Sequence, residues 1–143
     1  MKIKSPAFEE GGFIPAKYTC TSDDVNPPLL FEDVPRNAKS LALIFDDPDA
    51  RGWVHWILWN ISPDTKSIKE NSVPEGAVEG RTTFGTTRYG GPCPPTGTHR
   101  YVFTLYALDT VLDLRKSATR AELERAMIGH IIAEAKLIGK YHR

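Results

Sequence analysis

Three short apolar segments, rich in aromatic and β-branched residues, constrain the fold of this chain more than any other feature. They are SLALIFDD at residues 40–47, WVHWILWNI at 53–61 and YVFTLYALD at 101–109. Each is bounded by clusters of Pro, Gly and Asp, as strands commonly are. The DPDARG segment between the first two has turn composition, because Pro fixes φ while Asp and Gly accept unusual backbone angles. The pattern therefore predicts three buried strands.

The C-terminal segment has a different pattern, which indicates helix. Thr119 is followed three residues later by Glu122, the sequence of a capping box. Apolar residues then recur at helical spacing: Leu123, Met127, Ile131, Ala135 and Ile138. Gly139 suits a helix C-terminus, and Gly129 could divide the helix. We expect one or two helices here, with an apolar stripe that packs on the sheet or forms a homodimer interface.

Length and charge narrow the class of protein. The 143 residues contain no internal repeat or linker-like run, so we expect a single domain, 1–143. Lys plus Arg equals Asp plus Glu, 18 against 18, so no overall field favours nucleic acid or an anionic membrane. No apolar stretch approaches the roughly 18 residues of a membrane span, and the basic N-terminus lacks an apolar signal-peptide core. We therefore expect a cytoplasmic protein without stable membrane insertion.

The chain has two cysteines, Cys20 and Cys93, far apart in sequence. A reduced pair is the favoured interpretation for a cytoplasmic protein. The alternative is a disulfide, which would close a long loop and stabilise the fold by about 4 kcal/mol. The sequence leaves both states open.

Alternation along the strands predicts which side chains share a face. The resulting groups are His55 with Trp53, Ile57 and Trp59; Asp47 with Leu43 and Phe45; and Tyr101 with His99, Phe103 and Leu105. Taken singly, such residues are commonly a core histidine, a turn aspartate or a packed tyrosine. Together, beside the stiff GGPCPPTGT segment, they predict a preformed cavity whose imidazoles, phenol and carboxylate hold a phosphate-like anion.

The segments DDPDA, WVHWILWNI and GPCPPTGTHRYVFTLYALD resemble the phosphatidylethanolamine-binding protein family, in its short prokaryotic, Raf-kinase-inhibitor-like branch. The opening and closing segments, including SPAFEEGGFIPAKYTC and HIIAEAKLIGKYHR, are similar to that branch as well. The resemblance implies a Greek-key antiparallel β-sandwich with C-terminal helical segments. It also implies a small anion pocket for phosphate or the phosphorylethanolamine head group.

The resemblance also assigns residues to that pocket. The implied ligand-binding residues are Asp47, Trp53, His55, Gly91, Pro92, His99 and Tyr101. Pro48 would shape the turn, and Asp49 with Arg100 would form a buried ion pair between two loops. The loop after Ala50 is shorter than is usual in the family, which would open the rim or bring Arg51 beside it.

The predicted function is a non-catalytic binding or regulatory protein for phosphate, a phosphorylated head group or a phosphorylated peptide, without cofactor or metal. The alternative is inhibition of a serine protease or another enzyme through a surface loop, and a kinase or protease partner is not identified. Two other arrangements are less favoured. They are a Cys93–His99 nucleophile pair and a metal site of Asp47, His55 and His99.

Overall fold

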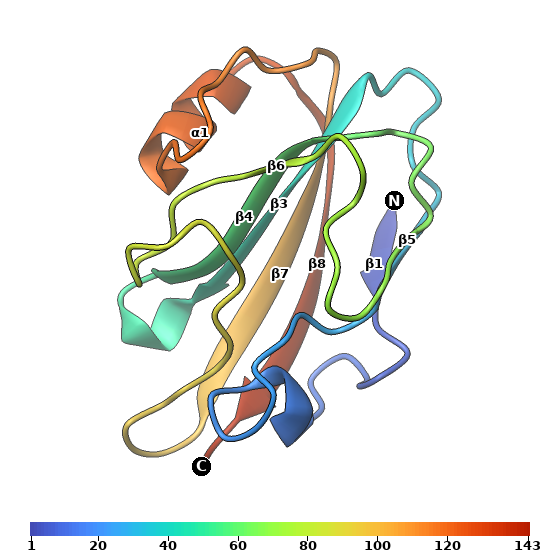
Figure 1. The fold of residues 1–143 in the computed structure, drawn as a ribbon. Helices are drawn as coiled ribbons and strands as arrows, with labels where there is room; N and C mark the ends of the chain where they lie inside the picture. Colours follow the sequence, from blue (N-terminus) through green and yellow to red (C-terminus); the bar gives the residue numbers. More distant parts are fainter.

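The computed structural model describes all 143 residues as two antiparallel sheets and one α-helix (Figure 1). The larger sheet has the strand order β6-β4-β3-β7-β8 and the smaller one the order β1-β2-β5. The strands are β1 (Lys2–Lys4), β2 (Leu29–Glu32), β3 (Ser40–Asp47), β4 (Trp53–Ile61), β5 (Ser67–Ile68), β6 (Val78–Glu79), β7 (His99–Leu108) and β8 (Ile131–Tyr141). Short 3₁₀ turns span Ala16–Tyr18 and Pro48–Ala50, and α1 spans Arg120–Met127. At eight residues, α1 is too short to span a bilayer.

The three predicted strands form the centre of the larger sheet. They are β3, β4 and β7, and β3 pairs with both of the others. The turn between β3 and β4 is closed by Arg51 and Gly52, with φ values of 57° and 74°. The predicted turn composition thus corresponds to a tight reversal that returns β4 alongside β3.

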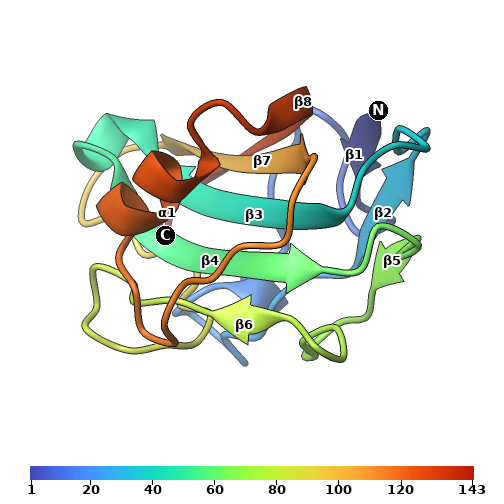
Figure 2. The same ribbon diagram turned by 90° about the horizontal axis from the view of Figure 1, so that it is seen from above.

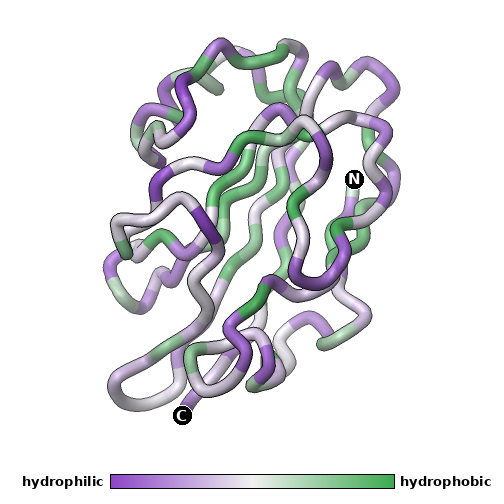
Figure 3. Tube along the Cα trace, viewed as in Figure 1, coloured by the Kyte–Doolittle hydropathy of each residue, from purple (hydrophilic) through white to green (hydrophobic).

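Two apolar cores cover the two faces of this sheet. On one face Leu41, Leu43 and Phe45 join a core of 20 buried residues that also receives the smaller sheet. On the other face Ala42 and Ile44 join a core of 10 buried residues beneath α1 (Figure 2). The hydropathy of the chain follows this arrangement, because apolar residues concentrate along the central strands (Figure 3). The predicted alternation therefore holds along β3.

The alternation predicted for His55 holds for Trp53 but is wrong for Ile57 and Trp59, because β4 contains a β-bulge. Phe45 pairs with Trp56 and Asp46 pairs with Val54, which leaves His55 as an extra residue. A bulge turns two successive side chains to one face. His55 accordingly lies 5.5 Å from Phe45 between ring centroids, whereas Ile57 and Trp59 belong to the core under α1. Because Trp53 pairs with Asp47, His55 lies on the face of Asp47 and Tyr101, and the bulge turns the following residues so that Ile57 and Trp59 face α1.

Only the part of the predicted helical segment before Gly129 is helix, and the part after it is a strand. The capping box of Thr119 and Glu122 is confirmed, but α1 ends at Met127 and residues 131–141 form β8, which pairs with β7 along its length. A spacing of four residues fits a helical period and also a period of two. The inward positions of β8 include Leu137, Gly139 and Tyr141, which are buried against the larger core. A strand beside β7 buries these residues and pairs its backbone.

The cysteines form a disulfide, Cys20–Cys93. The favoured interpretation, a reduced pair of cysteines, is therefore wrong. The alternative, a disulfide that closes a long loop, is the state in this structure. The pairing joins segments 73 residues apart in sequence. It depends on how the loop before β7 returns to the N-terminal loop, which no spacing in the sequence reveals.

Candidate functional site

A cavity of about 370 Å³ lies at the end of the larger sheet, where β3 ends and β7 begins. Its lining consists of Asp47, Ala50, Trp53, His55, Phe84, Cys93, Pro94, Pro95, His99 and Tyr101. The predicted residues Asp47, Trp53, His55, His99 and Tyr101 are thus brought together. Gly91 and Pro92 are not, because they lie behind the wall that Cys93, Pro94 and Pro95 form.

Asp47 holds His99 in one orientation. One carboxylate oxygen of Asp47 accepts from the backbone N–H groups of Asp49 at 2.8 Å and Ala50 at 3.1 Å. The other oxygen lies 2.6 Å from Nδ1 of His99, which donates to it. The Asp47 side chain is 3% exposed and that of His99 is 17% exposed. This bond leaves Nε2 of His99 free, to accept a hydrogen bond when the ring is neutral or to donate one when it is protonated.

His55 is held by the backbone of residues 90–98, the Gly–Pro segment that precedes β7. Its Nδ1 lies 2.7 Å from the carbonyl oxygen of Gly90, and because a carbonyl only accepts, Nδ1 carries the proton. Burial lowers the pKa of His55 below its usual value, against the opposing hydrogen bond to Gly90. The ring is therefore neutral near pH 7, with a lone pair on Nε2.

Tyr101 contributes a hydroxyl without a partner. The residue is fully buried, and although the Asp47 side chain and the Cys93 backbone lie near its hydroxyl, neither reaches it with hydrogen-bond geometry. Its ring centroid lies 5.3 Å from that of His55 and 6.3 Å from that of His99. Burial, and then the charge of Asp47, raises the pKa of Tyr101, so the hydroxyl stays protonated and can donate. Buried hydroxyls are normally paired, which makes this one a group that lacks its acceptor.

The remaining wall of the cavity is apolar and partly aromatic. Trp53 and Phe84 meet edge to face at 5.5 Å and are 38% and 44% exposed. Phe84, Ala50, Pro94 and Pro95 were not predicted as site residues. Phe84 comes from the loop after β6, where a single aromatic residue among threonines carries no signal of a site.

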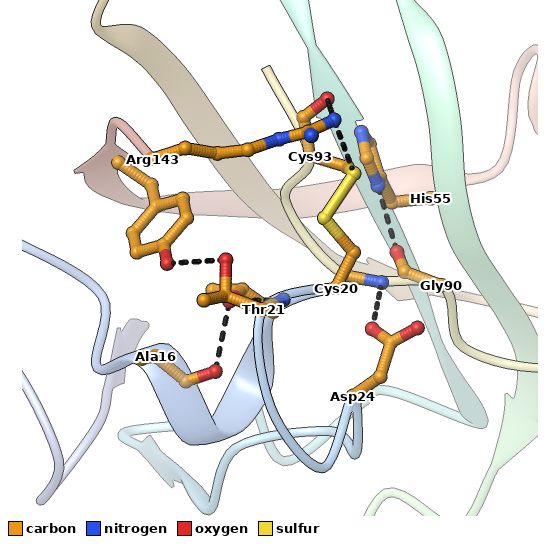
Figure 4. Close-up of a disulfide and its surroundings, with 11 residues drawn as sticks. Ala16, Cys20, Thr21, Asp24, His55, Gly90, Cys93 and Arg143 are labelled. Atoms are coloured by element: carbon orange, nitrogen blue, oxygen red, sulfur yellow. Dashed lines mark hydrogen bonds between the residues drawn. A yellow bond between two sulfur atoms is a disulfide. The ribbon is translucent and has the colours of Figure 1, made fainter. Parts of the chain in front are cut away.

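The Gly–Pro segment is fastened to the N-terminal loop. The N–H of Gly91 donates to Asp24 at 2.7 Å, and the N–H of Cys20 donates to the carbonyl of Pro92 at 3.1 Å. A Cβ on Gly91 would lie 2.2 Å from the carbonyl oxygen of Tyr18, so only glycine permits this approach. The disulfide adds a covalent link beside these bonds (Figure 4). Gly91 and Pro92 therefore position the cavity wall without forming its surface.

Asp49 and Arg100 pair as predicted, but at the surface. Arg100 donates to Asp49 from its backbone N–H and from two guanidinium nitrogens, at 2.8, 3.1 and 2.8 Å. These hydrogen bonds lower the pKa of Asp49 to about 2. The Arg100 side chain is 62% exposed, so the expectation of a buried pair is wrong. The turn begins at Pro48, and Arg51 is exposed and does not line the cavity.

The two less favoured arrangements do not form. Cys93 is bonded to Cys20 and has no free thiol to pair with His99. No three His, Cys, Asp or Glu side chains are arranged to hold a metal ion. What the cavity offers is one hydroxyl donor, two oriented imidazoles and a carboxylate that is already engaged.

Comparison with known proteins gives consistent results at the levels of sequence and structure. A sequence model described as phosphatidylethanolamine-binding protein matches residues 4–142. A UPF0098 protein of Methanothermobacter thermautotrophicus is 51% identical over 150 residues, which cover all of this chain and 99% of the relative. A UPF0098 protein of Pyrococcus abyssi is also 51% identical, over 97% of this chain and 84% of the relative.

Two solved structures share the fold. The crystal structure of a phosphatidylethanolamine-binding protein homologue from Chlamydia trachomatis has a TM-score of 0.95 at 46% identity, over 99% of this chain and 97% of that chain. The structure of YbcL from E. coli, described as a member of the mammalian family, has a TM-score of 0.92 at 27% identity, over 99% and 98%. The predicted fold class, a mainly antiparallel β-sandwich with a C-terminal helix, is confirmed.

Proposed function

This chain belongs to the phosphatidylethanolamine-binding protein family, and on that premise we propose that it binds a phosphate-like anion in the cavity between β3 and β7. The ligand is inorganic phosphate or the phosphate of a head group or peptide. The protein acts by binding rather than by catalysis.

The observation that carries this proposal is the unpartnered hydroxyl of Tyr101. A fully buried hydroxyl without an acceptor costs free energy, which a ligand oxygen would recover. The acceptor must enter through the cavity, because Tyr101 lines it. A phosphate oxygen is a strong acceptor and suits this position.

The two histidines determine which protonation state of the ligand binds. Their Nδ1 atoms are engaged by Asp47 and by the carbonyl of Gly90, so both rings offer Nε2 to a ligand. A neutral ring accepts a hydrogen bond from the remaining O–H of a monoanionic phosphate, whereas a dianion has no O–H to donate and pairs with a ring that has taken up a proton. Because the pKa of His55 is lowered by burial, binding of a dianion is accompanied by proton uptake.

The size and wall of the cavity favour a phosphate that carries a substituent. A volume of about 370 Å³ falls within the range of small-molecule sites, about 300–1,000 Å³, and exceeds what a lone phosphate fills. The apolar side formed by Trp53, Phe84 and Pro95 gives the substituent a surface to pack on.

The test is calorimetric titration of phosphate and phosphorylethanolamine into wild type and Tyr101→Phe. We expect Tyr101→Phe to weaken binding about tenfold, which corresponds to one lost hydrogen bond to a charged group. Tyr106→Phe is the matched control, since Tyr106 lies on the same strand but packs on the α1 side. Asp47→Ala and His99→Ala should abolish measurable binding. Equal affinity of Tyr101→Phe and wild type, or no binding by wild type, would contradict the proposal.

Inhibition of a serine protease is the alternative function, and it stays a prediction. An inhibitor should titrate its protease at a fixed stoichiometry, and the inhibition should survive His55→Ala because a surface loop would carry it. Loss of inhibition in that variant would assign the effect to the cavity instead.

A further inference from the structure

The disulfide is asymmetric with respect to the cavity. Cys93 is half-buried and belongs to the cavity lining, whereas Cys20 is exposed in the N-terminal loop. The greater exposure of the Cys20 residue favours attack by an incoming thiol at that end of the bond. Figure 4 shows the two cysteines between the N-terminal loop and the cavity wall.

A cation lies against the sulfur of Cys93. The Nη2 atom of Arg143 is 3.0 Å from Cys93 Sγ and 3.5 Å from the Cys93 carbonyl oxygen (Figure 4). The pairing of His99 with Tyr141 in the β7–β8 ladder brings the last residue of the chain to this place. Burial raises the pKa of Tyr101, and Arg143 acts in the opposite direction, so its charge also reaches the cavity floor. A guanidinium in this position stabilises a thiolate on Cys93.

We propose that the Cys20–Cys93 disulfide is a redox-sensitive part of the cavity that opens in one direction. The thiolate of a small thiol or dithiol attacks Sγ of Cys20, and the Sγ–Sγ bond breaks. Cys93 leaves as a thiolate beside Arg143. Exchange in this direction is favoured because the more exposed residue is attacked and the departing thiolate is stabilised by Arg143.

The exchange balances without any further reagent. A monothiol such as glutathione ends as a mixed disulfide on Cys20, and the electron pair of the broken bond stays on Cys93. With a dithiol, the second thiol then displaces Cys20. The cystine is thereby reduced by two electrons and the dithiol is oxidised by two to its disulfide.

The main consequence for the cavity is a change of charge. The wall segment keeps its noncovalent ties after the bond opens, namely Gly91 N–H to Asp24, Cys20 N–H to Pro92 and the Tyr89 hydroxyl to the carbonyl of Tyr18. The disulfide sulfur of the lining, however, becomes an anion. We infer that reduction weakens anion binding there, and this part rests on the proposed function.

The direction of exchange is tested on the folded protein with limiting glutathione at pH 7. Free thiols are trapped with N-ethylmaleimide, and the modified peptides are identified by mass spectrometry. We expect glutathione on Cys20 and maleimide on Cys93. Arg143→Gln should slow the exchange about three- to tenfold, whereas Arg125→Gln, which removes an exposed charge on α1, should not. Glutathione on Cys93, or an unchanged rate in Arg143→Gln, would overturn the proposal.

The effect on the cavity is tested by titrating inorganic phosphate into oxidised and dithiothreitol-reduced protein. We expect the reduced form to bind about tenfold more weakly, from like-charge repulsion in a partly buried site. A Cys20→Ser/Cys93→Ser variant lacks both bond and thiolate and should bind like the oxidised form. If this variant binds as weakly as reduced wild type, the charge explanation is wrong. If oxidised wild type does not bind phosphate, the proposed function fails while the direction of exchange stands on its own result.

Discussion

Two histidine–aspartate pairs flank the two ends of strand β7, and only one of them belongs to a cavity. His99 Nδ1 lies 2.6 Å from Asp47, and His130 Nδ1 lies 2.8 Å from Asp109. The chemistry and the distance are nearly the same. The exposure differs, since the side chains are 17% and 3% exposed in the first pair but 44% and 46% in the second.

The comparison shows that the surroundings, rather than the pair, make the candidate site. The Asp47 carboxylate also accepts two backbone hydrogen bonds from the turn that follows it. The Asp109 carboxylate accepts a hydrogen bond only from His130. Exposed ion pairs are screened by water and salt and contribute little. A buried pair is oriented by its neighbours and leaves a fixed lone pair or proton for a ligand.

Asp47→Ala removes the buried pair and should have the largest effect on stability of the substitutions considered. The change removes the partner of His99 and the acceptor of two turn N–H groups, so we expect the free energy of unfolding to fall by about 3 kcal/mol. Chemical denaturation measures this loss. A loss below about 1 kcal/mol would mean that water replaces the carboxylate and that the pair resembles the exposed one.

Tyr101→Phe sharpens the comparison by separating binding from stability. The hydroxyl has no partner within the chain, so its removal should not lower the free energy of unfolding and should raise it by about 1 kcal/mol, the cost of an unsatisfied buried hydroxyl. Phosphate affinity should nevertheless fall about tenfold, because the ligand loses one hydrogen bond. A clear loss of stability in Tyr101→Phe would indicate that the hydroxyl serves the fold.

The pH dependence of stability examines the other buried histidine, His55. Burial lowers its pKa in the folded protein below the value of about 6.5 that it has when unfolded. The unfolded chain therefore takes up a proton first as the pH falls. Stability is full above pH 6.5 and decreases below it, down to the pKa of the folded state. In denaturant titrations from pH 7.5 to 5, His55→Gln should show a smaller decrease than wild type; an equal decrease would contradict this assignment.

Asp109→Ala should have the smallest effect. The exposed pair with His130 is worth less than about 0.5 kcal/mol, and the change should not alter phosphate affinity. Thermal unfolding and the same calorimetric titration measure both quantities. A loss comparable to that of Asp47→Ala would show that the position of the pair at a strand end, and not its burial, sets its contribution.

Local sequence was sufficient to predict the central strands and one end of the helix. The runs at 40–47 and 53–61 match β3 and β4 because their flanking turns have distinct chemistry, and the capping box of Thr119 and Glu122 is a short-range contact. Residues 131–141 were predicted wrongly because a spacing of four fits both helix and strand. Pairing with β7 decides between them, and β7 lies more than 20 residues away in the sequence.

The features of the candidate site can be separated in the same way, into those set by local sequence and those set by tertiary contacts. The sequence by itself determined which polar residues stand at strand ends and that a stiff Gly–Pro segment precedes β7. Only the tertiary structure decided that a bulge turns Ile57 and Trp59 away from the face of His55, that Phe84 closes one side, and that Cys93 meets Cys20 and Arg143. The physical reason is the separation along the sequence of the residues that interact. Strand propensity, turns and caps are governed by neighbours in the chain, whereas bulge position, cavity lining and disulfide pairing depend on contacts between distant segments, which form only when both sheets pack.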